Sequence, residues 1–121
     1  MAKIFLDTNV FIDLVEEREQ ITLPDFLGNE LFISPLSIHI LTYIYKYNIP
    51  NDTLSEIQNY FNFVPFDEIV TKNALVGPTQ DFEDNVQLHS AAEAECNVFL
   101  TNDQQLQDLK FFGKTRIINK L

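Results

Sequence analysis

The sequence has little that would cross-link it, anchor it in a membrane or draw it to a polyanion. Its one cysteine, Cys96, excludes an internal disulfide and makes a cysteine-built zinc site unexpected. No apolar run is long enough to span a bilayer, and no signal peptide precedes the first expected strand. Eight Lys and Arg stand against eighteen Asp and Glu, a net charge of −10, so no broad basic surface is available for phosphates. We therefore expect a cytoplasmic protein with no membrane partner, one that needs cations to approach nucleic acid.

What the chain does contain is enough apolar material for one core. It has 121 residues, 45% of them hydrophobic, including eleven Phe, which predicts a single globular domain over residues 1–121. Short apolar runs alternate with helical patterns along its whole length. This alternation favours an α/β fold in three layers, with helices on both faces of a mostly parallel central sheet of four to five strands. We expect strands at 3–6, 31–34, 62–66, 98–101 and 116–118, and helices at 10–17, 35–48, 53–61, 67–74 and 81–96.

Four aspartates lie where the strands of such a sheet end. Asp7 and Asp103 follow two of the expected strands, and Asp81 and Asp84 open the helix before the second of these. A right-handed crossover brings the start of that helix to the carboxyl edge of the sheet, where open α/β sheets bind ligands. Clustered carboxylates repel unless protons or cations compensate, and Mg²⁺ and Mn²⁺ prefer oxygen ligands. The pattern therefore favours metal-assisted phosphodiester hydrolysis.

Each aspartate also has a purely structural interpretation. Asp7 can close a turn, Asp81 and Asp103 can cap helices, and Asp84 suits the dipole of a first helical turn. For any one residue this interpretation is as good as the functional one. The convergence of the four at strand ends is what favours a site.

Two stretches, "FLDTNVFIDLV" near the start and "DFEDNVQLHSAAEAECNVFLTND" late in the chain, together resemble the PIN domain. The resemblance implies a Rossmann-like α/β/α fold and a ribonuclease that depends on Mg²⁺ or Mn²⁺ and cleaves single-stranded or structured RNA. Many such domains are VapC-type toxins, so the resemblance also implies an antitoxin partner. Carried over by position, the catalytic and metal-binding residues are Asp7, Asp84 and Asp103, and the supporting ones are Asp81, Asn9 and Thr101.

One acid of the PIN pattern is replaced. PIN nucleases usually carry a Glu early in the helix after the second strand, and "SIHILTYIY" places Ile40 there, next to a His39 that we expect to be exposed. An apolar side chain cannot bind a metal, so the alternative is a PIN-like module that acts through protein or RNA binding. A small regulatory domain that binds Mg²⁺ for phosphoryl transfer is a third interpretation, disfavoured because no strand-end Lys accompanies the acids.

Two further features have open interpretations. The helix over residues 36–47 is apolar almost all round; we expect 36, 40, 43, 44 and 47 to face the sheet. Ile38, Leu41 and Tyr45 lie off that stripe and suggest either a homodimer surface or cover by neighbouring helices. The late basic residues could hold an RNA phosphate, meet an acidic partner or simply be solvated. They are Lys110, Lys114, Arg116 and Lys120.

Overall fold

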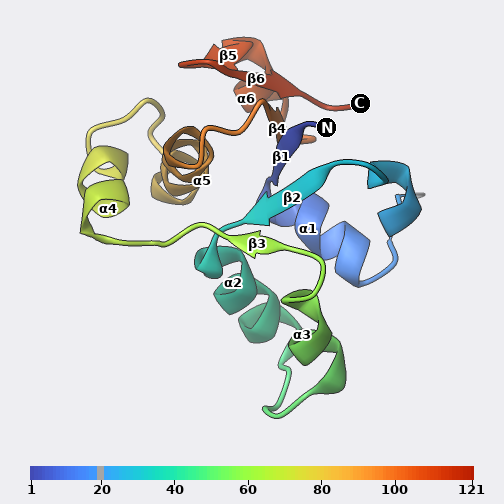
Figure 1. Ribbon diagram of the computed structural model, residues 1–121. Helices are drawn as coiled ribbons and strands as arrows, with labels where there is room; N and C mark the ends of the chain where they lie inside the picture. The colour runs from blue at the N-terminus through green and yellow to red at the C-terminus, as the bar shows by residue number, and fades with distance from the viewer. Residues whose placement is uncertain (19–20) are drawn as a thin grey trace.

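The computed structural model describes residues 1–18 and 21–121, which form a central sheet with helices on both of its faces (Figure 1). The sheet has six strands in the order β3-β2-β1-β4-β6-β5, and every neighbouring pair is parallel except β5–β6. This confirms the predicted α/β class and the mostly parallel sheet. The strands are β1 (Lys3–Leu6), β2 (Glu30–Ile33), β3 (Asn62–Phe63), β4 (Val98–Leu100), β5 (Phe111–Phe112) and β6 (Thr115–Ile118).

β5 is the strand that the sequence did not reveal. Only two residues long, it turns back through Gly113 and Lys114 to pair antiparallel with β6. Gly113 has φ +60°, a conformation that glycine adopts without a side-chain clash. So short a strand has no periodicity to detect, which is why the expected strand number was one too low.

The helices start where polar side chains cap them. Asn51, Asp67 and Asp81 accept hydrogen bonds from backbone N–H groups in the first turns of α3, α4 and α5, a role that the sequence suggested for Asp81. The first helix begins earlier than the expected 10–17: it starts at Thr8, its N-cap is Asp7, and Asn9 lies exposed within its first turn. The helices are α1 (Thr8–Val15), a 3-10 turn η1 (Leu23–Phe26), α2 (Pro35–Tyr45), α3 (Asp52–Ile57), α4 (Glu68–Ala74), α5 (Phe82–Glu93) and α6 (Gln104–Leu109).

Strand β1 divides the core into two halves. Ile4 and Leu6 point into a cluster shared with α1, α2, α3 and η1, whereas Phe5 points to the opposite face, where α5 and α6 pack. On that second face the Phe5 and Phe99 rings stack with centroids 5.6 Å apart. Successive side chains of a strand alternate between faces, so a run that is apolar throughout predicts burial on both sides. Helix α4 lies outside this arrangement and packs against α5 (Figure 1).

Helix α2 is turned differently from the prediction. Leu41 is fully buried, while Tyr43 and Ile44, which were expected to face the sheet, are 77% and 57% exposed. The inward face includes a polar residue, Ser37, whose hydroxyl lies 2.9 Å from that of Thr8 on α1. Because nearly every side of this helix is apolar, its sequence has no apolar stripe that predicts which side faces the core. The buried hydroxyl pair of Ser37 and Thr8 contributes to fixing the orientation of α2.

Candidate functional site

Asp7 stands at the carboxyl end of β1 and is almost entirely buried. Its backbone N–H donates to the Leu100 carbonyl of neighbouring β4 at 3.0 Å, so the β1–β4 pairing fixes where the residue lies. One carboxylate oxygen accepts from the Thr8 N–H at 2.8 Å and the other from the Thr101 hydroxyl at 2.7 Å. Burial raises the pKa of Asp7, the two hydrogen bonds oppose this, and the charges of Asp103 and Asp81 add to the rise.

Thr101 links Asp7 to the second acidic segment. It follows β4, is fully buried, and its hydroxyl accepts from the Asp103 N–H at 3.0 Å while it donates to Asp7. The Asp103 carboxylate caps α6 by accepting from the N–H groups of Gln105 and Leu106, at 2.8 and 3.2 Å. The ends of two adjacent parallel strands thus carry Asp7 and Asp103 to one edge of the sheet. This is the placement that the sequence predicted.

The third segment is the N-terminus of α5. The Asp81 carboxylate accepts from the Asp84 N–H at 3.0 Å and caps the helix. The loop before it is held by Asn85, a residue that the sequence analysis did not single out. Its side-chain oxygen accepts from the N–H and the hydroxyl of Thr79, and its amide donates to the carbonyls of Ala74 and Thr79. Asn85 is buried, and its four hydrogen bonds fix the approach to the first turn of α5.

Asp84 differs from Asp7, Asp81 and Asp103 because, in the described part of the chain, no hydrogen bond to its carboxylate is found. Burial is the largest cause that raises its pKa to about 7, followed by the charges of Asp81, Asp7 and Asp103, and then of Glu83. Every group in that set is a carboxylate, so nothing positive offsets the repulsion. The charges of the other three predicted aspartates, Asp81, Asp7 and Asp103, therefore all reach Asp84.

Glu83 is a fifth member of this acidic cluster and was missed in the sequence. Burial raises its pKa first, then the charges of Asp81 and Asp7, and a hydrogen bond from Thr8 opposes the rise. Its position between Asp81 and Asp84 in "DFED" was the available signal. That signal is weak, because acids are common in first helical turns for the sake of the dipole alone.

The carboxylate oxygens of the cluster are the donor type that a hard divalent cation prefers, but their side chains are not arranged to bind one directly. Across residues 1–18 and 21–121, no three His, Cys, Asp or Glu side chains stand in an arrangement that could hold a metal ion. Asp7, Asp81 and Asp103 all accept hydrogen bonds from their surroundings, which sets their orientation. Oxygen donors that repel one another, with no basic group among the charges acting on Asp84, suit Mg²⁺ or Mn²⁺ held partly through water.

Ile40, where the resemblance expects a Glu, is half-buried and packs against the apolar cluster of β1, α1 and α2. One helical turn earlier, Ser37 joins Thr8 on α1 to the Gln87 amide of α5, the latter at a long 3.4 Å. This buried polar link ties together the helices that carry the acidic cluster. The equivalence of Ile40 with the Glu of other PIN domains stays a prediction.

Comparison with known proteins agrees with this arrangement. A sequence model of the PIN domain matches residues 4–112. The chain belongs to the PIN domain family. A chain in the crystal structure of VapBC2 from Rickettsia felis bound to a DNA fragment from their promoter superposes with a TM-score of 0.66. At 14% identity, with 96% of this PIN domain and 97% of that chain covered, the likeness shows a shared fold. Among curated proteins, nothing matches.

The histidines and the cysteine of this PIN domain lie outside the set of groups whose charges act on Asp84. His39 is exposed, as the sequence suggested. Cys96 is buried, and burial raises the pKa of its thiol to about 11. His89 is half-buried, within 2.8 Å of the Gly77 carbonyl. None of the helices in the described ranges has the length and hydropathy needed to cross a membrane.

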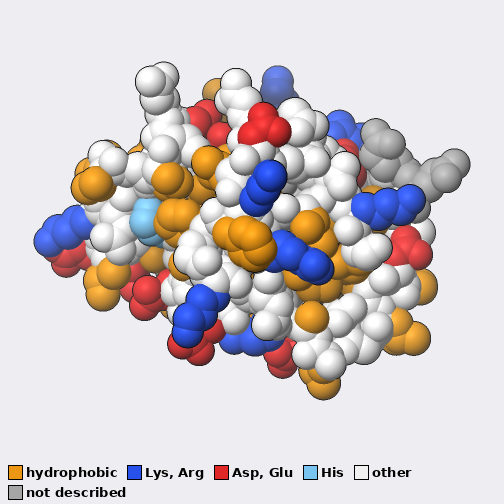
Figure 2. All heavy atoms as spheres, turned by 90° about the horizontal axis from the view of Figure 1, so that it is seen from above, with side chains coloured by type: hydrophobic (Ala, Val, Ile, Leu, Met, Phe, Trp, Pro, Cys, Tyr) orange, Lys and Arg blue, Asp and Glu red, His pale blue; other side chains and the backbone are white. Residues whose placement is uncertain are grey.

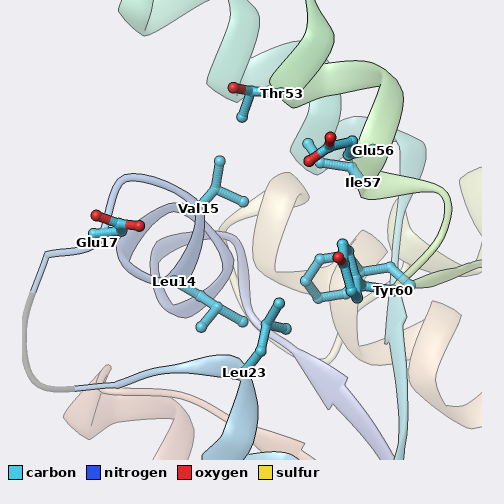
Figure 3. A pocket seen from close by; sticks show the side chains of 9 residues that line it. Leu14, Val15, Glu17, Leu23, Thr53, Glu56, Ile57 and Tyr60 are labelled. Carbon is cyan, nitrogen blue, oxygen red and sulfur yellow. The ribbon is translucent and has the colours of Figure 1, made fainter.

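A separate cavity of about 230 Å³ lies between α1, η1 and α3 (Figure 3). Its wall is mostly apolar, and the carboxylates of Glu17 and Glu56 stand on its rim (Figure 3). None of the acids of the cluster lines it, so the hollow and the candidate site are different parts of the molecule. The residues that line it are Leu14, Val15, Glu17, Leu23, Thr53, Glu56, Ile57, Tyr60 and Phe61.

Proposed function

We propose that this PIN domain is a ribonuclease that hydrolyses RNA phosphodiesters with the help of Mg²⁺ or Mn²⁺. The observation that carries the proposal is the convergence of Asp7, Asp84 and Asp103 from three separate segments, so that the charges of Asp7 and Asp103 both act on Asp84. Membership of the PIN family supports it. A divalent cation, when bound at such a site, would activate water and neutralise charge on the phosphate.

The residues of the chain have distinct roles in this proposal. Asp7 is held rigidly by Thr8 and Thr101, so it offers a fixed ligand position. Asp84 is held by no hydrogen bond found among the described residues, and because its pKa is raised to about 7, a cation that binds there near neutral pH competes with a proton. Asp103 completes the set while it caps α6, and Asp81 assists by capping α5. Thr101 supports the site by orienting Asp7 and the Asp103 backbone together.

The alternative is a catalytically weak or inactive PIN module that acts through protein or RNA binding. The absence, in the described ranges, of a ready three-ligand metal arrangement favours it, as does the apolar Ile40 on α2. Three carboxylates with water can still hold one cation, although weakly. Cleavage should therefore require high metal concentrations, and Mn²⁺ should support it better than Mg²⁺.

The likeness to a chain of the VapBC2 structure supports a further part of the proposal, that this domain is the toxin of a toxin–antitoxin pair in the cytoplasm. The exposed Tyr43 and Ile44 on α2 offer room for a homodimer through residues 36–47. A small gene directly upstream that encodes a DNA-binding protein would support the pair. If neighbouring genes encode nothing of that kind and no small protein copurifies with the chain, the toxin assignment is wrong.

The test of the ribonuclease is cleavage of a labelled single-stranded RNA by the purified chain, with Mg²⁺, with Mn²⁺ and with a chelator. Asp7→Asn keeps the shape of the side chain and removes its charge. Asp52→Asn, an exposed acid in the first turn of α3, is the matched control. We expect metal-dependent cleavage by the original chain and by Asp52→Asn, and none by Asp7→Asn. Equal activity in both variants would point to a contaminating nuclease or to another site.

A further inference from the structure

The edge of the sheet formed by β5 and β6 carries a basic and aromatic surface that the acidic cluster does not use. We call it the β5–β6 patch and define it as Lys110, Phe111, Lys114 and Arg116. Phe111 and Arg116 are cross-strand partners in the antiparallel pair, so their side chains lie on the same face. Phe111 is 59% exposed and Arg116 is exposed. Lys110 directly precedes β5, and Lys114 lies in the tight turn between the two strands.

The charge of this patch stands out in an acidic chain. Three of the eight Lys and Arg residues lie in one short hairpin, although the net charge is −10. None of the three forms an ion pair with a carboxylate among the described residues, in contrast to Lys72, which pairs with Glu68. Figure 2 views the molecule from the side on which β5 and β6 lie and shows Lys and Arg side chains beside hydrophobic ones. The cations are therefore free to meet phosphates.

The exposed Phe111 ring and the basic side chains beside it indicate which kind of molecule the patch binds. Proteins hold single-stranded nucleic acid by stacking bases on aromatic rings while basic side chains follow the backbone. An acidic peptide would use the cations but not the ring, and a two-residue edge strand offers little backbone for strand addition. A duplex keeps its bases stacked and out of reach of Phe111. We propose that the β5–β6 patch binds a single-stranded segment of RNA, with a base on Phe111 and phosphates at Lys114 and Arg116.

The patch and the acidic cluster lie at the two ends of one short helix, α6. Asp103 caps the start of α6 and Lys110 is its C-cap. Six helical residues rise by about 9 Å, so one RNA strand along α6 reaches both ends. The carboxylate on α6, Asp108, accepts a hydrogen bond from Gln104, which partly satisfies its charge. The choice of RNA as the ligand rests on the proposed ribonuclease function. In this inference the patch binds the RNA strand next to the acidic cluster.

The experiment measures RNA binding without metal, so that cleavage plays no part. The probe is a fluorescent, unstructured oligouridine of about 20 nucleotides, longer than the roughly 4–16 that one single-strand site covers. Fluorescence anisotropy in the presence of EDTA gives the affinity of the full chain at several salt concentrations. Phe111→Ala is compared with Tyr43→Ala, an aromatic residue that is 77% exposed on α2. The double variant Lys114→Gln, Arg116→Gln is compared with Lys72→Gln, an exposed Lys on α4.

We expect Phe111→Ala to weaken binding by roughly tenfold, the loss of one stacked base, and Tyr43→Ala to leave it unchanged. The double variant should lower the slope of log affinity against log salt by about 1.4, two phosphates at about 0.7 each, and Lys72→Gln should not. All five substituted side chains in the patch and its controls are exposed, and thermal melts will show that the variants fold.

Three outcomes would overturn the inference. The first is that unlabelled duplex RNA or polyglutamate displaces the labelled oligouridine as effectively as unlabelled oligouridine does. The second is that Phe111→Ala and Tyr43→Ala have equal affinities, and the third is that the original chain does not bind. Binding without cleavage would refute the ribonuclease and leave the proposal for the patch intact.

Discussion

The carboxyl edge of the sheet and the cavity between α1, η1 and α3 both gather carboxylates, in opposite surroundings. At the sheet edge, Asp7 is buried and Asp84 is half-buried, the charges of neighbouring carboxylates act on both, and both pKa values rise. At the cavity, Glu17 and Glu56 are exposed on the rim of an apolar hollow. The difference teaches that in this PIN domain the shape of the surface is a poor guide to chemistry. A cluster of carboxylates held together despite their mutual repulsion is a better guide to where chemistry takes place.

The largest effect that separates the two regions should be on catalysis. Asp84→Asn removes the acid whose charge is least satisfied, and we expect it to lower metal-dependent RNA cleavage by roughly 100-fold, since charge stabilisation at a reacting phosphate is lost. Glu56→Gln makes the same chemical change at the cavity and should leave the rate unaltered. Initial cleavage rates of the labelled RNA in Mn²⁺ measure both. Similar losses in the two variants would mean that the cavity contributes to the site.

A smaller effect is expected from the hydroxyl that joins Asp7 to Asp103. Thr101→Val preserves the side-chain shape but leaves a buried carboxylate oxygen and the Asp103 N–H without a partner, which should cost about 1–3 kcal/mol of unfolding free energy. Urea denaturation provides the measurement.

The matched control for this change is Thr115→Val. Thr115 is also buried, and its hydroxyl donates to the Cys96 carbonyl at 2.9 Å on the opposite edge of the sheet. Both variants should lose stability, but only Thr101→Val should also weaken Mn²⁺ binding by calorimetry. Unchanged metal affinity in Thr101→Val would remove Thr101 from the supporting residues.

The smallest effect concerns pH. The pKa of Asp84 is about 7 in the folded chain against an ordinary value of 3.8, so the folded state binds more protons than the unfolded state between these values. Stability therefore falls as the pH rises from about 4 to about 7 in metal-free protein. Denaturation in EDTA across this range should show the decline, and Asp84→Asn should flatten it. A decline of the same size in Asp84→Asn would assign it to other groups, such as Asp7 or Glu83, whose pKa values are also raised.

Local patterns predicted much of the fold and of the candidate site. The strand ends at Asp7 and Asp103, and the helix caps at Asp81 and Asp103, depend on a few neighbouring residues, so they could be recognised in the sequence. The orientation of α2 could not, because nearly every side of that helix is apolar and the choice depends on which neighbours it packs against. Strand β5 was missed because it exists only through its pairing with β6.

The sequence by itself determined that an α/β domain forms and that four aspartates stand at one edge of its sheet, because strand and helix signals are local and parallel strands end on the same side. Only the tertiary structure decided how far those aspartates are buried and which charges act on them. Burial and the distances between segments far apart in the chain set the pKa of Asp84, brought Glu83 into the cluster and gave Asp7 its Thr101 partner. Desolvation and charge repulsion depend on positions in space, so no reading of neighbouring residues could supply them.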